Sequence, residues 1–359
     1  MNRQFDLLLA GAGHAHLGVV RQWLIEQRPQ GRIALISDGP YAWYSGMLPG
    51  LLARRYQAGQ CRIPLQELCS AANIELLQGR LVDLAPDRNT LTFSDGRQLS
   101  ATWLSINLGS QPKPLPVLDG QLELLPVKPF DAFLTTWQKW CQSPQPLAIL
   151  GGGAAGVELA LALASQVPSV TLISTALILS GHPPALRERA VRRLVQAGVT
   201  VLEGVTVDSI RDRDLMSGTR IIWQGRRVIL ATGASPLTWL YEAGLSCDEQ
   251  GFIRVSNTLQ SLSHPHILVA GDCASLVNTP RNGVYAVRQG PILAANLAAA
   301  LSGLPLGRFV PQRRALALLA DGHGGALMSW AGMTAEGSLL GWWKDRLDRR
   351  FIHRHLAKH

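Results

Sequence analysis

The chain of 359 residues contains few cysteines, and its five cysteines are scattered without a CxxC pair. This spacing argues against a disulfide framework and favours a reducing compartment, so we expect a cytoplasmic protein. The chain also lacks an uninterrupted run of about 18 apolar residues, which argues against a transmembrane helix. Glycines and histidines at residues 11–16 interrupt the apolar start of the chain, so a first β-strand is expected there rather than a signal peptide. A hydrophobic content of 47% is enough to form hydrophobic cores and argues against disorder.

The net charge is +9, and basic residues concentrate at 187–193 and 344–358. No nucleic-acid partner is expected, because neither a binding module nor a surface with interleaved aromatic and basic residues is evident. On a helix, Trp343, Leu347, Phe351 and Arg354 would share one side, with Trp342 nearby. Such a stripe suits the anionic inner face of a membrane, and it equally suits docking on the protein's own body or on a second subunit. A peripheral membrane contact through this tail and a homodimer therefore both stay open.

Two glycine-rich turns of the same design occur in the chain, GAGHAH at residues 11–16 and GGGAAG at residues 151–156. Each follows an apolar run typical of a buried strand, at 5–10 and 147–150, and each opens a helical stretch. A further strand follows in each copy, at 33–37 and 170–174. In such turns the glycines allow a sharp bend and a close approach of the backbone to a pyrophosphate at the helix N-terminus. The repeat favours two nucleotide-binding units over two merely structural βαβ turns.

Three later motifs follow apolar strands: NLGSQP at 107–112, ATGASP at 231–236 and HILVAGDCA at 266–274. Asp272, at the end of the last strand, can accept hydrogen bonds from sugar or ribityl hydroxyls. The helix predicted from about residue 284 to 301 can stabilise negative charge on a reduced flavin with its N-terminus.

In this order, the five motifs resemble those of the FAD-dependent pyridine nucleotide-disulfide oxidoreductase superfamily over about residues 4–305. The resemblance implies an α/β fold with two Rossmann-like dinucleotide-binding domains and a small C-terminal region. It implies an FAD-binding domain of residues 1–112 and 256–305 and an NAD(P)-binding domain of residues 113–255. Residues 306–359 would form an interface or membrane-surface region. FAD is the implied cofactor, and NAD(P)H is the implied substrate.

Three stretches resemble a narrower group: GAGHAH, PYAWYSGMLPGLLA at 40–53 and GVYAVRQGPILAANL at 283–297. They are similar to the flavoprotein unit associated with selenide water dikinase and, more distantly, to type II NADH dehydrogenases. This resemblance implies a small-molecule electron acceptor, and it suggests selenide water dikinase or a related selenium enzyme as a partner.

The chain departs from these relatives at several positions. Residues 39–50 contain no cysteine, so a redox dithiol is not expected. Val284 and Arg288 stand where two glutamines line the quinone site of type II dehydrogenases, which puts a quinone acceptor in doubt. His16 replaces the third glycine of the first turn, and a hydrogen-bonded interior histidine is one interpretation of it. The second unit has Ser174 where an acidic residue would bind a ribose, so the sequence does not distinguish NADH from NADPH.

Two residues are predicted to take part in catalysis. By resemblance, Glu158 would position the nicotinamide or relay a proton, although a glutamate stabilised by the helix dipole would have the same sequence. Lys128 would approach the flavin. No metal site is expected, because the HxH pairs lack an accompanying ligand set. The residues predicted to bind a cofactor are Gly11, Ala12, Gly13, His14, Ala15, Asp38, Met47, Leu81, Gly109, Gly271, Asp272, Val284, Tyr285, Gly151, Gly153, Ala154, Gly156 and Gly233.

The sequence therefore predicts an FAD-dependent oxidoreductase that passes electrons from NAD(P)H through flavin to an acceptor without a dithiol. The acceptor is a quinone or a small selenium or sulfur compound. Two alternatives stay open: an FAD-bound scaffold or sensor with little nicotinamide turnover, and a peripheral membrane flavoprotein.

Overall fold

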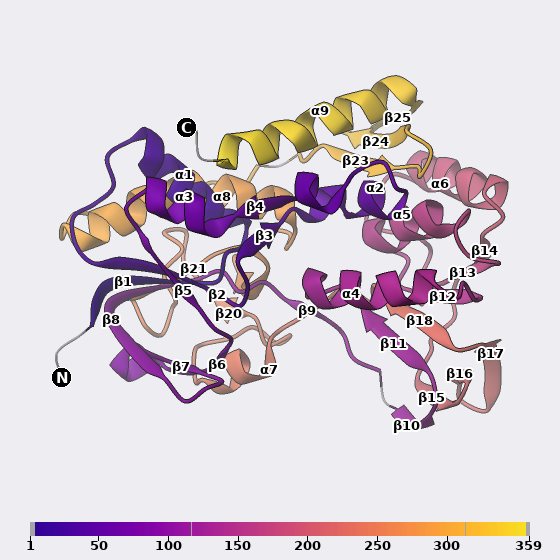
Figure 1. Cartoon of the computed structure of the whole chain (residues 1–359), viewed down its shortest axis with the longest axis horizontal. Coiled ribbons are helices and arrows are strands. Elements are labelled where there is room, and N and C mark those ends of the chain that lie inside the picture. The colour runs from indigo at the N-terminus through magenta and orange to yellow at the C-terminus, as the bar shows by residue number, and fades with distance from the viewer. Residues whose placement is uncertain (1–3, 116, 313, 357–359) are drawn as a thin grey trace.

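The computed structural model describes residues 4–115, 117–312 and 314–356. The chain forms two α/β bodies at opposite ends of an elongated molecule, with the C-terminal helix α9 (Ser338–His355) running along both (Figure 1). The first body is built mainly from residues 5–106 and 238–301, and the second body from residues 117–230.

The first body contains a seven-stranded sheet in which β8 is shared by a parallel and an antiparallel part. The parallel part has the order β5-β2-β1-β8-β21, and β7 and β6 continue from β8 in antiparallel pairing. These strands are β1 (Phe5–Ala10), β2 (Ile33–Ser37), β5 (Glu75–Gln78), β6 (Leu81–Ala85), β7 (Thr90–Phe93), β8 (Gln98–Ile106) and β21 (Ile267–Val269). The apolar runs of β1 and β2 are almost fully buried, as expected for parallel strands covered on both faces.

Helices α1 (His14–Ile25) and α8 (Gly283–Leu301) pack together on one face of this sheet. They approach closely at two glycines, since a Cβ added to Gly18 would lie 3.1 Å from the Cα of Gly290. The other regular elements of this body are β3 (Tyr41–Trp43), β4 (Arg62–Pro64), α3 (Leu65–Ala71), α7 (Thr238–Glu242), β20 (Ile253–Arg254) and β22 (Ala274–Ser275). Helix α2 (Leu48–Leu52) comes from the same part of the sequence but packs on the second body, where Leu48 and Leu52 enter the core.

The second body contains a five-stranded parallel sheet in the order β11-β18-β12-β13-β14. Its strands are β11 (Glu123–Pro126), β12 (Leu147–Leu150), β13 (Val170–Ile173), β14 (Thr200–Leu202) and β18 (Arg227–Leu230). Leu147 and Ile149 pack with helices α4 (Phe130–Cys141), α5 (Ala154–Leu163) and α6 (Pro184–Gln196). Ala148 and Leu150 face a smaller sheet formed by β10 (Val117–Gly120), β15 (Ser209–Asp212), β16 (Asp214–Ser217) and β17 (Arg220–Gln224).

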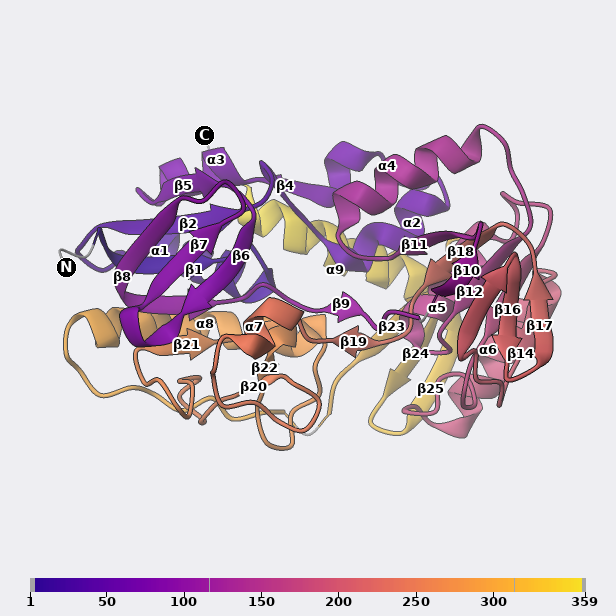
Figure 2. The same ribbon diagram turned by 90° about the horizontal axis from the view of Figure 1, so that it is seen from below.

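The chain crosses between the bodies in a short ribbon. Strand β9 (Gln111–Pro112), which ends the NLGSQP motif, pairs antiparallel with β19 (Ala234–Ser235) of the ATGASP motif. Figure 2 shows this ribbon between the two bodies. The two motifs, distant in sequence, thus lie side by side at the junction.

The C-terminal region connects the two bodies a second time. Strands β23 (Ala317–Ala320), β24 (Ala326–Trp330) and β25 (Met333–Gly337) form a meander against α5 and α6, with Leu319 and Leu327 in the core of the second body. Helix α9 then returns to α1 and β4, where Ile352 enters the core of the first body. Within the described ranges, no helix combines the length and apolarity needed to cross a membrane. The predicted α/β fold with two Rossmann-like units is confirmed.

Candidate functional site

The first glycine turn lies between β1 and α1 at the carboxyl edge of the first sheet. Gly11 has φ +95°, a backbone conformation that glycine adopts without steric cost, and its N–H donates to the Ile36 carbonyl at 2.9 Å. A Cβ added to Gly13 would overlap the carboxamide of Asn107, so this position has no room for a side chain. The turn thus lies beside the ends of β2 and β8, the edge at which open α/β sheets bind ligands.

Buried polar side chains support the turn from within the body. His16 Nδ1 lies 2.6 Å from the Gly11 carbonyl and Nε2 lies 2.8 Å from the Ser105 hydroxyl. Because a carbonyl only accepts, Nδ1 donates and Nε2 accepts from the serine. Burial lowers the pKa of His16 to about 4, which keeps it neutral. His16 is therefore a hydrogen-bonded interior histidine, one of the interpretations that the sequence left open.

Asn107 links three of the sequence motifs. Its Oδ1 accepts hydrogen bonds from the N–H groups of Ala15 (3.1 Å) and His16 (3.2 Å), and its Nδ2 donates to the Ala270 carbonyl at 2.7 Å. The glycine turn, the NLGSQP segment and the HILVAGDCA segment are thereby held together by one buried side chain. The NLGSQP motif contains this residue, but the sequence did not indicate its role, since its partners are 91 to 163 residues away.

Three predicted residues from three different segments converge beside this turn. Lys128 Nζ lies 3.0 Å from Asp272 Oδ2, with the lysine side chain 36% and the aspartate 20% exposed. The charges of both residues act on His14, whose pKa is lowered to about 4, chiefly by burial. A cation, a carboxylate and a neutral imidazole thus lie together at the carboxyl edge of the first sheet.

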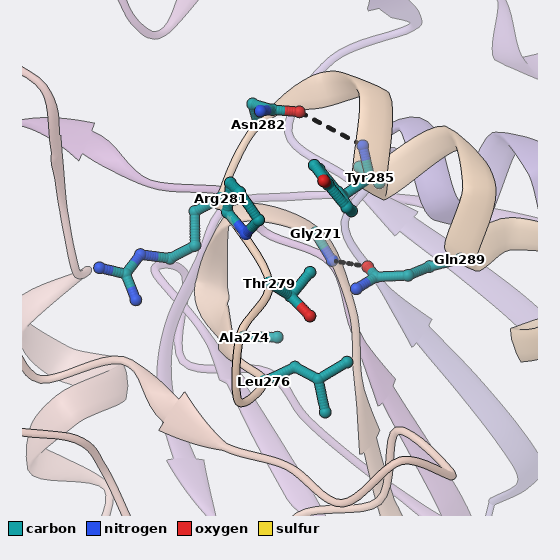
Figure 3. Close-up of a pocket in the computed structure, with 10 residues that line it drawn as sticks. Gly271, Ala274, Leu276, Thr279, Arg281, Asn282, Tyr285 and Gln289 are labelled. Carbon is teal, nitrogen blue, oxygen red and sulfur yellow. Dashed lines mark hydrogen bonds between the residues drawn. The ribbon is translucent and has the colours of Figure 1, made fainter. Parts of the chain in front are cut away.

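The turn after β21 is fixed by helix α8, as Figure 3 shows. The Gly271 N–H donates to Gln289 Oε1 at 2.7 Å, and Asn282 Oδ1 accepts from the N–H groups of Val284 (3.1 Å) and Tyr285 (3.3 Å). Gly271, Asn282, Tyr285 and Gln289 line a small pocket. The Asn282 side chain therefore satisfies two of the N–H groups at the start of α8.

The remaining predicted residues of the first body surround the same edge or its core. Asp38 is exposed immediately after β2, Gly109 (φ +77°) follows β8, and Val284 is 37% exposed at the start of α8. Met47 and Leu81 are buried, at 1% and 7% exposure. Ala12 is partly buried in the glycine turn itself.

The second glycine turn lies at the carboxyl edge of the second sheet. Gly151 has φ +122°, and a Cβ there would overlap the Ala231 carbonyl; a Cβ on Gly156 would overlap the Gly151 carbonyl. Around Gly153, in contrast, no heavy atom of the described residues lies within 4 Å of an added Cβ, apart from those of the glycine and its immediate chain neighbours. Among the described residues no side chain caps α5, which begins at Ala154. The backbone here is packed tightly on one side and open on the other, as expected for a phosphate-binding turn.

Glu158, one turn into α5, lies under the C-terminal region. Its Oε1 accepts a hydrogen bond from the Ala320 N–H at 2.7 Å. Burial raises the pKa of Glu158 to about 7, although the charge of Lys344 and the Ala320 bond lower it. Lys344 donates to the Gly46 carbonyl at 2.7 Å and to Asp348 Oδ2 at 2.8 Å.

Glu158 and the pair of Lys344 and Asp348 therefore form a partly buried charge network between α5 and α9. The lysine and aspartate side chains are 13% and 7% exposed. The sequence predicted a role for Glu158 but not for Lys344 or Asp348, because the sequence does not show which distant segment covers α5.

Aromatic rings continue this contact between α9 and the first body. Phe351 stacks on Tyr44 with centroids 4.2 Å apart, and both rings lie 5.5 Å from His14. The C-terminal helix thus reaches a residue of the first glycine turn.

Comparison with known proteins decides the family. Residues 5–290 match the profile of the pyridine nucleotide-disulphide oxidoreductases. The chain belongs to this family. It is 27% identical over 254 residues to ferroptosis suppressor protein 1 of Taeniopygia guttata, over 65% of this chain and 66%, just under two thirds, of that protein. It is 24% identical over 286 residues to the NADH dehydrogenase-like protein YutJ of Bacillus subtilis, over 76% of this chain and 78% of that protein.

A solved structure supports the assignment of the fold. The sulfide:quinone oxidoreductase of Aquifex aeolicus superposes with a TM-score of 0.78 at 18% sequence identity, over 98% of this chain and 92% of that chain. Pyridine nucleotide-disulphide oxidoreductases bind FAD and NAD(P)H, as the resemblance implied. The residues present fit these groups, because both glycine turns lie at carboxyl sheet edges and the second has open space at Gly153.

Proposed function

We propose that the chain is an FAD-dependent NAD(P)H oxidoreductase that passes electrons to a small-molecule acceptor. Residues 1–112 and 256–305 would form the domain that binds FAD, and residues 113–255 would form the domain that binds NAD(P)H. Residues 306–359 would connect these two domains and cover them. The observation that carries the proposal is the pair of glycine turns at two carboxyl sheet edges of one chain. When bound, the flavin accepts a hydride from the nicotinamide and passes on electrons one or two at a time.

The first body would bind FAD through its carboxyl edge. The Gly11–Gly13 backbone would approach the pyrophosphate, and Asp38 would accept from ribose hydroxyls. Asp272 would accept from ribityl hydroxyls, with Lys128 holding its carboxylate in place through the 3.0 Å ion pair. Asn107 would hold the first glycine turn and the segment before Asp272 in place relative to each other.

The charge network under α9 would provide a group that takes up and releases protons, the Glu158 carboxyl. A carboxyl whose pKa lies near 7 exchanges protons readily at physiological pH, and Glu158 has a pKa of about 7. Lys344 would stabilise its ionised form, and Asp348 would in turn balance the lysine charge. The network lies beside a pocket lined in part by Gly46, Ala320 and Lys344, which provides a small space next to it.

No dithiol step is included, because the cysteines are poorly suited to one. All five are unpaired. Burial raises the pKa of Cys61 and of Cys69 to about 12 and that of Cys273 to about 11. Thiolates are the reactive form, so these thiols would be inert at neutral pH.

The acceptor classes that we propose are a quinone and a small selenium or sulfur compound. Gln289, the glutamine nearest to the expected quinone motif, is used to bind the Gly271 N–H. Val284 and Arg288 offer different chemistry at the two expected positions, which favours an acceptor other than a quinone. Interaction with selenide water dikinase or a related selenium enzyme stays a prediction from the resemblance.

A second candidate property, contact with a membrane surface, rests on the outer face of α9. Leu339 and Trp342 are 81% and 62% exposed, and Arg346 and Arg350 are exposed on the same side. The two aspartates of this helix bind inner partners: Asp345 accepts from Tyr56, and Asp348 is buried. An outer face with aromatic and basic residues and without acids suits an anionic membrane surface, so a location at the inner face of the membrane is proposed.

The test of the proposed function is an anaerobic titration of the purified protein with NADH and with NADPH. Bleaching of the flavin absorbance by either, followed by recovery on addition of a quinone or of a selenium or sulfur compound, is expected. Bound FAD that neither nicotinamide reduces would instead support the scaffold or sensor.

A further inference from the structure

Three loops meet at the carboxyl edge of the second sheet. The glycine turn follows β12, residues 174–179 follow β13, and Glu203 follows β14. The Gly151 N–H donates to the Ile173 carbonyl at 2.8 Å, and the Ser174 N–H donates to the Leu202 carbonyl at 2.8 Å. Ser174 and Glu203 are therefore the first residues beyond two adjacent, paired strands.

The loop after β13 folds against the glycine turn. The Leu179 N–H donates to the Gly152 carbonyl at 2.8 Å, and a Cβ added to Gly152 would overlap the Ser174 side chain. In dinucleotide-binding units this loop usually carries the acid that binds the adenosine ribose. Here it carries Ser174 and Thr175, which have no charge.

A carboxylate nevertheless reaches this loop from the next strand. Glu203 Oε1 accepts from the Ile178 N–H at 2.7 Å and from Arg187 Nε at 3.3 Å, and Arg187 Nη2 donates to Oε2. The side chains are 21% and 29% exposed, so both remain accessible from solvent. Burial raises the pKa of Glu203, but the bonds from Arg187 and Ile178 outweigh it and hold the pKa below its usual range.

We propose that the ion pair of Glu203 and Arg187 determines the nicotinamide preference, with Glu203 supplying the carboxylate that Ser174 cannot. This inference rests on the proposed binding of NAD(P)H to the second body. A carboxylate repels the 2′-phosphate of NADPH and accepts from the free 2′-hydroxyl of NADH. The same carboxylate neutralises Arg187, whose guanidinium would otherwise suit a phosphate. The expected wild-type preference is therefore for NADH.

The experiment compares the binding of ADP-ribose and of its 2′-phosphate derivative by titration calorimetry. Glu203→Gln should shift the ratio of the two dissociation constants toward the phosphorylated ligand by about tenfold or more, because it removes the repelling charge and releases Arg187. Arg187→Met should shift the ratio toward unphosphorylated ADP-ribose, because the charge of Glu203 is then no longer neutralised. Glu123→Gln is the matched control, since Glu123 pairs with Arg227 Nε at the same distance, 3.3 Å, but at the amino ends of β11 and β18.

The FAD content and the thermal unfolding of each variant show whether the fold is intact. If the wild type binds ADP-ribose, but Glu203→Gln and Arg187→Met leave the ratio as in Glu123→Gln, this inference is overturned and the proposed function stands. If Glu203→Gln weakens both ligands equally, the pair only holds the loop, which also overturns it. Wild-type protein that holds FAD but binds neither ligand would overturn the proposed nicotinamide site and this inference together.

Discussion

Replacing Glu158 with glutamine should remove a pH dependence of stability that belongs to this carboxyl. Burial raises its pKa from 4.5 to about 7 in the folded chain. Since a tenfold change in proton affinity corresponds to about 1.4 kcal/mol, the fold disfavours the ionised carboxylate by about 3 kcal/mol. The free energy of unfolding is therefore unaffected below the unfolded pKa, falls as the pH rises from there to about 7, and is constant above it.

Urea unfolding at about pH 5 and about pH 8 measures this difference. Over that interval the wild type should lose about 2 to 3 kcal/mol more than Glu158→Gln. Glu188→Gln, a change at an exposed glutamate of α6, should follow the wild type. Equal losses in the wild type and Glu158→Gln would refute the reasoning, because the carboxyl would then titrate alike in the folded and unfolded chains.

Three further predictions concern binding. Gly13→Ala, whose new methyl group would overlap Asn107, should destabilise the fold by about 1 to 3 kcal/mol and lower the FAD content. Gly153→Ala, whose methyl group would lie in open space, should leave the stability and the FAD content unchanged and weaken only ADP-ribose binding in calorimetry. Asp272→Asn should weaken FAD binding to the apoprotein by about tenfold, measured by flavin fluorescence, and an unchanged affinity would exclude its proposed contact. Replacing both Trp342 and Trp343 with alanine should reduce cosedimentation with anionic vesicles at unchanged FAD content; undiminished binding would argue against α9 as the membrane surface.

The sequence predicted the local parts of the fold well. The strands at 5–10, 33–37 and 147–150 have the expected bounds, because each is an apolar run closed by glycine or a polar turn. Both glycine turns lie between a strand and a helix, since their backbone angles depend on the glycines themselves. Features of the fold that depend on residues close together in the sequence were therefore predictable.

Contacts between distant segments were not predictable. Asn107 binds residues of two other motifs, and Lys344 comes to Glu158 from the far end of the chain. Helical spacing also predicted Phe351 on the same apolar stripe as Trp343, but in the structure Phe351 points inward and stacks on Tyr44. Both faces of α9 carry apolar residues, so periodicity could not show which face docks on the first body.

The most direct test of the account combines flavin content with reduction. The purified chain, or its apoprotein incubated with FAD, should bind about one flavin per chain, and anaerobic NADH should bleach that flavin. The Gly13→Ala protein should bind little flavin and show little bleaching. Protein that is folded but takes up no flavin would contradict the central claim that the two glycine turns hold FAD and a nicotinamide within one chain.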